Sequence, residues 1–107
     1  MAYSRIKMTE LFPIFEDLPS DALILDVRRA DEFSGGRVPG ARHIPFNEVA
    51  AHAADLKAPS AVYVYCQAGA RSQRACDVLA GLGLTNLVCI VDSGWPEWAL
   101  RGYPIER

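Results

Sequence analysis

Three short apolar runs constrain the fold of this chain more than any other feature. They span residues 22–27, 61–65 and 87–91, and each is rich in Val, Ile, Leu or Tyr with little polar interruption. Strands that are buried on both faces of a parallel sheet have this composition. A weaker candidate strand lies near residues 5–8. Because amphipathic stretches separate the runs, we expect an α/β fold with a mostly parallel sheet of about five strands and helices on both faces.

The stretches between the strands predict helices. The expected helices span residues 9–15, 47–56, 71–82 and 96–101. Thr9 and Asn47 are candidate caps for the first two, because their side-chain oxygens can accept a free backbone N–H. Glycine and proline crowd residues 33–45, so we expect that segment to be a surface loop with tight turns.

The clearest helix is the third. Four apolar residues recur at helical spacing in it, and they are Ala75, Val78, Leu79 and Leu82. A stripe of this kind faces the core of a globular domain. We therefore expect these four side chains to be buried.

Length and charge limit the classes of function. A chain of 107 residues fits one domain, residues 1–107, and its formal net charge is −2. That balance offers no general attraction to nucleic acid or to an anionic membrane, and no apolar run is long enough for a membrane helix. The N-terminus, residues 1–10, lacks the apolar core of a signal peptide, so we expect a cytoplasmic protein.

The cysteines point to thiol chemistry rather than to cross-links or metal. The chain has three, Cys66, Cys76 and Cys89, with no Cys-x-x-Cys pair and only two histidines. A domain of this size needs no disulfides, and this set predicts no metal site. Cys76 on a helix and Cys89 in a strand are expected to pack in the core. Cys66 is the candidate reactive thiol.

Cys66 stands where a predicted strand ends and a predicted helix begins. The small residues after it let the backbone curl and point successive N–H groups inward, as an anion-binding nest does. The amino-terminal end of the next helix adds positive potential and favours the thiolate. The residues predicted to form this nest are Gln67, Ala68, Gly69, Ala70 and Arg71. A core cysteine beside a solvated arginine is the alternative interpretation.

Two arginines are candidate substrate-binding groups. The fork of Arg71 could hold an oxyanion or brace the carbonyls of the loop. Arg28 follows a neighbouring strand and could add charge to the same rim. Arg37 and Arg42 lie in the glycine-rich loop, where solvated arginines are the simpler interpretation.

The chain resembles the rhodanese family over about residues 6–106. The segments that carry the resemblance are LILDVR at 23–28, EF at 32–33, GRVPGARHIP at 36–45, CQAGARS at 66–72 and GWPEWALRGYP at 94–104. Each segment is weak alone, but their order and spacing are specific. Arg37 stands where the family commonly has histidine, and Ser93 where a glycine is common.

The resemblance implies a thiosulfate sulfurtransferase. In that family a loop cysteine takes the outer sulfur of a small sulfur-donor anion such as thiosulfate and becomes a persulfide. Cyanide, a thiol or a thioredoxin-like protein then removes the sulfur. Cys66 would be this nucleophile, and no metal or organic cofactor is implied.

Two other functions remain open. Some cysteine phosphatases share this fold, but their loop has one residue more between Cys and Arg than the four here. Rhodanese-like domains that have lost the nucleophile act as binding or regulatory modules. The presence of Cys66, Gly69 and Arg71 disfavours that alternative.

Overall fold

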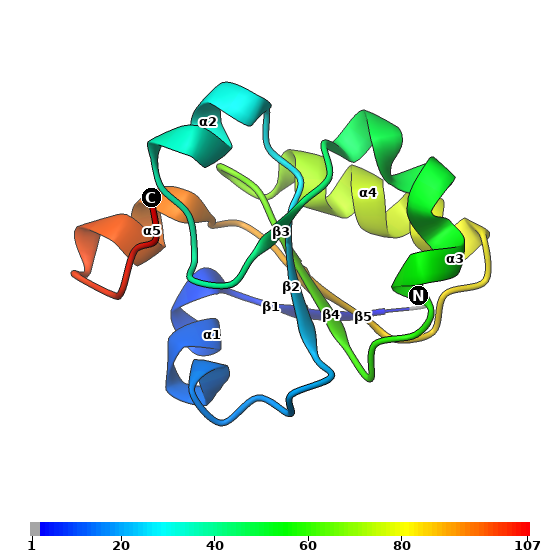
Figure 1. The fold of residues 1–107 in the computed structure, drawn as a ribbon, viewed down its shortest axis with the longest axis horizontal. Coiled ribbons are helices and arrows are strands. Elements are labelled where there is room, and N and C mark those ends of the chain that lie inside the picture. The colour runs from blue at the N-terminus through cyan, green and yellow to red at the C-terminus, as the bar shows by residue number, and fades with distance from the viewer. Residues whose placement is uncertain (1–2) are drawn as a thin grey trace.

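The computed structural model describes residues 3–107, which form a five-stranded sheet in the order β1-β5-β4-β2-β3 (Figure 1). The strands are β1 Ser4–Ile6, β2 Leu23–Asp26, β3 Arg42–His43, β4 Val62–Tyr65 and β5 Leu87–Ile90. The helices are α1 Met8–Phe15, α2 Ala30–Gly35, the 3-10 helix η1 Phe46–His52, α3 Ala53–Leu56, α4 Ala70–Gly81 and α5 Trp95–Leu100. Every strand pair in the sheet is parallel. The predicted α/β class and parallel sheet are confirmed.

The sheet separates two hydrophobic clusters because successive side chains of a strand point to opposite faces. Leu25 and Val64 belong to the cluster beneath η1, α3 and α4. Ile24 and Tyr65, their neighbours in β2 and β4, belong to the cluster beneath α1 and α5. Figure 1 shows α1 and α5 on one side of the sheet and α3 and α4 on the other. The prediction of helices on both faces is confirmed.

The buried face of α4 is rotated about the helix axis relative to the predicted apolar stripe. Ala75 and Leu79 are buried as expected, but Val78 is 44% exposed and Leu82 is 46% exposed. Cys76 faces the core instead, together with Ser72. The rotation follows from the start of the helix, where the Ser72 hydroxyl faces inward and donates to the carbonyl oxygens of Gly69 and Ile90. Cys76 and Cys89 are both buried in the core, as predicted.

Several local predictions are wrong. The N-cap of α1 is Lys7, whose N–H binds the Glu10 carboxylate at 2.8 Å, so Thr9 is not the cap. Pro45, not Asn47, precedes η1, and the expected helix over 47–56 is a 3-10 helix continued by α3. The expected loop over 33–45 contains the end of α2 and the short strand β3.

Candidate active site

The end of β4 brings Cys66 to the carboxyl edge of the sheet. Cys66 directly follows Tyr65, the last residue of β4, and α4 begins four residues later at Ala70. Because β4 lies between β5 and β2, the cysteine emerges at the middle of this edge. Ligands of open parallel sheets bind at this position.

Two backbone amides point at the sulfur of Cys66. The N–H of Gly69 donates to Sγ at 3.1 Å, and the N–H of Ser72 donates at 3.3 Å. The hydroxyl of Ser72 lies 3.5 Å from the same sulfur. Cys66 is only 1% exposed, so these donors act where water screens them little. The arrangement stabilises negative charge on sulfur at the amino-terminal end of α4.

Two glycines allow the loop to take this shape. Gly69 caps α4 with φ +108°, and a Cβ there would lie 2.7 Å from the Asp92 nitrogen. A Cβ on Gly94 would collide with the carbonyl oxygens of Cys66 and Gln67. The next residue, Trp95, donates its N–H to the Cys66 carbonyl at 3.0 Å. The loop is therefore seated against the segment that joins β5 to α5.

Not every residue of the predicted nest turns its N–H group to the Cys66 sulfur. In residues 3–107 the backbone N–H donors that reach Sγ are those of Gly69 and Ser72, and none belongs to Gln67, Ala68, Ala70 or Arg71. Ala68 and Ala70 are exposed on the outer side of the loop. Their role toward a bound donor stays a prediction. Ser72, absent from the predicted site residues, is the last residue of the CQAGARS segment that carried the resemblance.

Arg71 binds a carboxylate rather than the loop carbonyls. Its Nη1 lies 2.7 Å from Glu32 Oε1, and its Nη2 lies 3.1 Å from Oε2. This two-point pair holds the pKa of Glu32 down at about 2, with the hydrogen bond from Arg71 as the main cause. Glu32 in turn raises the pKa of Arg71. The alternative in which Arg71 braces the loop carbonyls is therefore wrong. Glu32 was not among the predicted site residues, although it belongs to the EF segment.

Arg28 does not lie on the rim of the loop. It is 1% exposed, and its Nη2 lies 2.7 Å from Asp26 Oδ2 and 2.7 Å from the Gly36 carbonyl oxygen. Its guanidinium also lies over the rings of Trp95 and Tyr65, 4.9 and 5.6 Å from their centroids. A buried guanidinium needs such partners to offset desolvation. The expectation that Arg28 adds charge to the rim is wrong, and its geometry is that of a core residue.

Across the described part of the chain, no three His, Cys, Asp or Glu residues come together as metal ligands do. In the same residues, no helix has the length and apolar character needed to cross a bilayer.

The fold and the site define an α/β protein with a cysteine held by backbone amides at the carboxyl edge of its sheet. The family model for a rhodanese-like domain matches residues 14–101, and the chain belongs to the rhodanese family. A protein of Staphylococcus saprophyticus with a solved structure superposes with a TM-score of 0.81 at 30% identity, covering 97% of this chain and 99% of that one. The human single-domain sulfurtransferase has the same fold, with a TM-score of 0.73 at 24% identity over 94% of this chain and 97% of that one.

Curated relatives include named enzymes and proteins without an assigned activity. The thiosulfate sulfurtransferase GlpE of Pseudomonas putida is 38% identical over 87 residues, which are 79% of this chain and 76% of that protein. The uncharacterized protein YqhL of Bacillus subtilis is 35% identical over 72% of this chain, and the putative sulfur carrier protein YrkF of the same organism is 33% identical over 70%. The chain spans 60% of the length of YqhL and 40% of that of YrkF.

Proposed function

We propose that this chain is a sulfurtransferase that carries sulfane sulfur as a persulfide on Cys66. The observation that carries the proposal is the pair of N–H donors, from Gly69 and Ser72, that point at Sγ. Two such donors stabilise a charged sulfur more than a neutral thiol, because hydrogen bonds to an ionised acceptor are the stronger ones. The GlpE relative, named as a thiosulfate sulfurtransferase, supports the same activity.

The first half-reaction moves one sulfur atom onto the enzyme. The Cys66 thiolate attacks the outer sulfur of thiosulfate, a new S–S bond forms, and the S–S bond of thiosulfate breaks. Sulfite leaves with the electron pair, so charge and atoms balance without an oxidant. The persulfide then carries its negative charge on the outer sulfur, one bond beyond the Sγ atom at which the Gly69 and Ser72 amides point.

The second half-reaction returns the enzyme to its starting state. Cyanide or the thiolate of an acceptor attacks the outer sulfur of the persulfide, and Cys66 leaves as a thiolate. A thiol, a thioredoxin-like protein or a dedicated carrier can serve as this acceptor. The carrier name of the YrkF relative favours a protein acceptor among these.

Intact-protein mass spectrometry after treatment with thiosulfate tests the proposal. The protein should gain the mass of one sulfur atom on the peptide that contains Cys66, and cyanide should remove it. The C66S variant should gain nothing while keeping its fold, and a normal gain by that variant would contradict the proposal.

The C76S variant is the matched control. Hydrogen bonding with Cys89 and burial raise the pKa of the Cys76 thiol, which keeps this thiol protonated and unreactive. C76S should therefore retain most of the activity. A loss as large as that of C66S would instead indicate a relay between two thiols.

The same protein sample separates the two other functions. Hydrolysis of para-nitrophenyl phosphate faster than consumption of thiosulfate would indicate a phosphatase. Failure to consume thiosulfate and to hydrolyse the phosphate ester would favour a binding module.

A further inference from the structure

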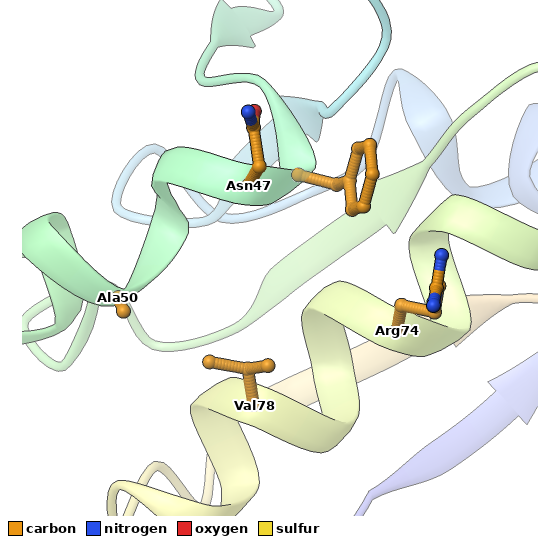
Figure 2. Close-up of a pocket in the computed structure, with 5 residues that line it drawn as sticks. Asn47, Ala50, Arg74 and Val78 are labelled. Carbon is orange, nitrogen blue, oxygen red and sulfur yellow. The ribbon is translucent and has the colours of Figure 1, made fainter.

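A groove of about 310 Å³ lies between η1 and α4. Its lining is mainly apolar and consists of Phe46, Asn47, Ala50, Arg74 and Val78. Figure 2 shows Arg74 and Val78 on α4 across from Ala50 on η1. A concave apolar surface with a single charged group is typical of a binding site.

The apolar surface continues beyond the groove along α4. Val78 and Leu82 are 44% and 46% exposed, although the helical pattern of the sequence predicted that both would be buried. They are four residues apart and therefore lie on one face of the helix. From Arg74 to Leu82 the helix and its C-cap rise by about 12 Å. This strip is longer than a small thiol and matches a segment of a protein surface.

Arg74 forms the charged end of the groove. Within residues 3–107 Arg74 takes part in no ion pair, whereas Arg71, one turn earlier on α4, is held by Glu32. The Arg74 guanidinium instead lies 5.8 Å from the centroid of the Phe46 ring. Its charge is complementary to an acidic group on whatever occupies the groove.

This charged end adjoins the Cys66 loop. Ser72, whose N–H donates to the Cys66 sulfur at 3.3 Å, and Arg74 both lie in the first turns of α4, about 3 Å apart along its axis, with Ser72 facing the core and Arg74 facing solvent. On the η1 side of the groove, the N–H of Phe46 donates to the Val27 carbonyl oxygen. The N–H of Val27 in turn donates to the carbonyl oxygen of Tyr65, the residue before Cys66. Phe46 packs against the hydrophobic cluster that contains Cys66, so the groove lies on the same face of the sheet as this cysteine, and Arg74 lies at the end of α4 nearer the Cys66 loop.

We propose that this groove docks the thiol-bearing protein that discharges the Cys66 persulfide. The partner presents an acidic side chain to Arg74 and an apolar side chain to the strip of Phe46, Val78 and Leu82, next to its reacting cysteine. The partner thiolate attacks the outer sulfur, the persulfide S–S bond breaks, and Cys66 leaves as a thiolate, so no further reactant is needed. This inference rests on the proposed sulfurtransferase function and names the acceptor surface that the function requires.

Synthetic peptides serve as probes of the acceptor. The full chain is loaded with thiosulfate, and the rate of persulfide discharge is measured with each acceptor. The test peptide is acetyl-Glu-Cys-Leu-Leu-amide, and its Lys-Cys-Leu-Leu and Glu-Cys-Ser-Ser counterparts change the charge and the apolar residues in turn. The small thiol 3-mercaptopropionate and cyanide are the non-peptide acceptors. The first peptide should discharge the persulfide about fivefold faster than either counterpart and than 3-mercaptopropionate. Equal rates for the three peptides would overturn the proposal. A rate for 3-mercaptopropionate equal to that of the first peptide would indicate a site for small thiols and would also overturn it.

Two groove variants and one control test the residues. R74E should reverse the preference between the Glu and Lys peptides, and V78D should remove the preference for Leu over Ser, each measured relative to cyanide discharge of the same variant. R101E, an exposed cation beyond α5, should leave both preferences unchanged. Unaltered preferences in R74E and V78D would contradict the assignment of the groove.

A binding measurement separates this proposal from the proposed function. The peptide acetyl-Glu-Ser-Leu-Leu-amide cannot accept sulfur, and its binding is followed by NMR through the amide shifts of the full chain. Shifts should concentrate at Ala50 and Val78 and weaken in R74E. If no persulfide forms but these shifts appear, the groove stands and the sulfurtransferase function fails. If the persulfide forms but the shifts lie elsewhere, the groove proposal fails alone.

Discussion

Arg71 and Glu32 form a two-point ion pair that joins α4 to α2 across the mouth of the Cys66 loop. The two N–O distances are 2.7 and 3.1 Å. Glu32 Oε1 also accepts the N–H of Arg29, which caps α2. One carboxylate thus orders the start of α2 and orients the arginine in the first turn of α4, directly after the Cys66 loop.

The ion pair predicts an acid-dependent loss of stability. The pKa of Glu32 is lowered to about 2 in the folded protein from the ordinary value of 4.5 for a glutamate carboxyl, so the folded state binds fewer protons between these values. The stabilisation is complete above about pH 4.5 and is lost as the pH falls towards 2. We expect it to be about 1 kcal/mol, because solvent partly screens the pair. Urea unfolding between pH 2 and 6 measures this contribution. The free energy of unfolding of E32Q should depend less on pH over this range than that of the unaltered protein. An identical profile in E32Q would exclude Glu32 as the source.

Gly69 should tolerate no side chain. G69A places a Cβ at φ +108° and 2.7 Å from the Asp92 nitrogen, which should cost about 2 kcal/mol of unfolding free energy. The displaced amide should also slow persulfide formation by about tenfold or more. The control is G81A in α4, where a Cβ meets nothing within 4 Å and alanine should stabilise the helix by about 0.5 kcal/mol. Equal effects of the two variants would contradict the strained geometry of the loop.

Arg28 should contribute to stability and not to donor binding. R28M leaves the fully buried Asp26 carboxylate without its cation, and we expect a loss of about 3 kcal/mol in chemical denaturation. The matched variant R42M breaks an exposed pair with Asp55, at 3.8 Å, and should cost less than about 1 kcal/mol. Stability of R28M equal to that of R42M would refute the structural role, and an R28M protein that keeps full stability but binds thiosulfate poorly would instead indicate a role of Arg28 in donor binding.

Ser72 should matter for both the loop and the thiol. Its hydroxyl lies 2.7 Å from the Ile90 carbonyl oxygen and 2.9 Å from that of Gly69. S72A removes a buried donor and should cost about 1–2 kcal/mol while slowing persulfide formation severalfold. The control is S60A, which removes the exposed hydrogen bond to Asp21. It should change the free energy of unfolding by at most a few tenths of a kcal/mol and leave the rate of persulfide formation unchanged. The rates of sulfur loading and the unfolding midpoints of the two variants decide the point.

The residues near Cys66 show how far local sequence can define a site. The position of the thiol was predictable, because an apolar run ends at Tyr65 and helical periodicity begins a few residues later. The donors that reach its sulfur were only partly predictable, because small residues indicate a tight loop but do not determine which N–H groups point inward. The contact of Ser72 with the sulfur was not predicted, because a serine in the first turn of a helix is usually exposed to solvent.

The partners of the arginines were less predictable. Arg28 and Arg71 looked equivalent as cations near one sheet edge, yet one pairs with Asp26 inside the core and the other with Glu32 at the surface. The exposure of Val78 and Leu82 was also unforeseen, because the periodicity of an apolar stripe leaves its rotation about the helix axis uncertain by a residue.

The amino-acid sequence by itself determined the class of fold, four of the five strands and the cysteine at the edge of the sheet. These properties follow from local composition and period, since a strand buried on both faces needs an uninterrupted apolar run. Only the tertiary structure decided which amides face the thiol, which carboxylate each arginine meets and which apolar side chains of α4 stay in solvent. Such contacts join residues far apart in the chain, and packing in three dimensions selects them.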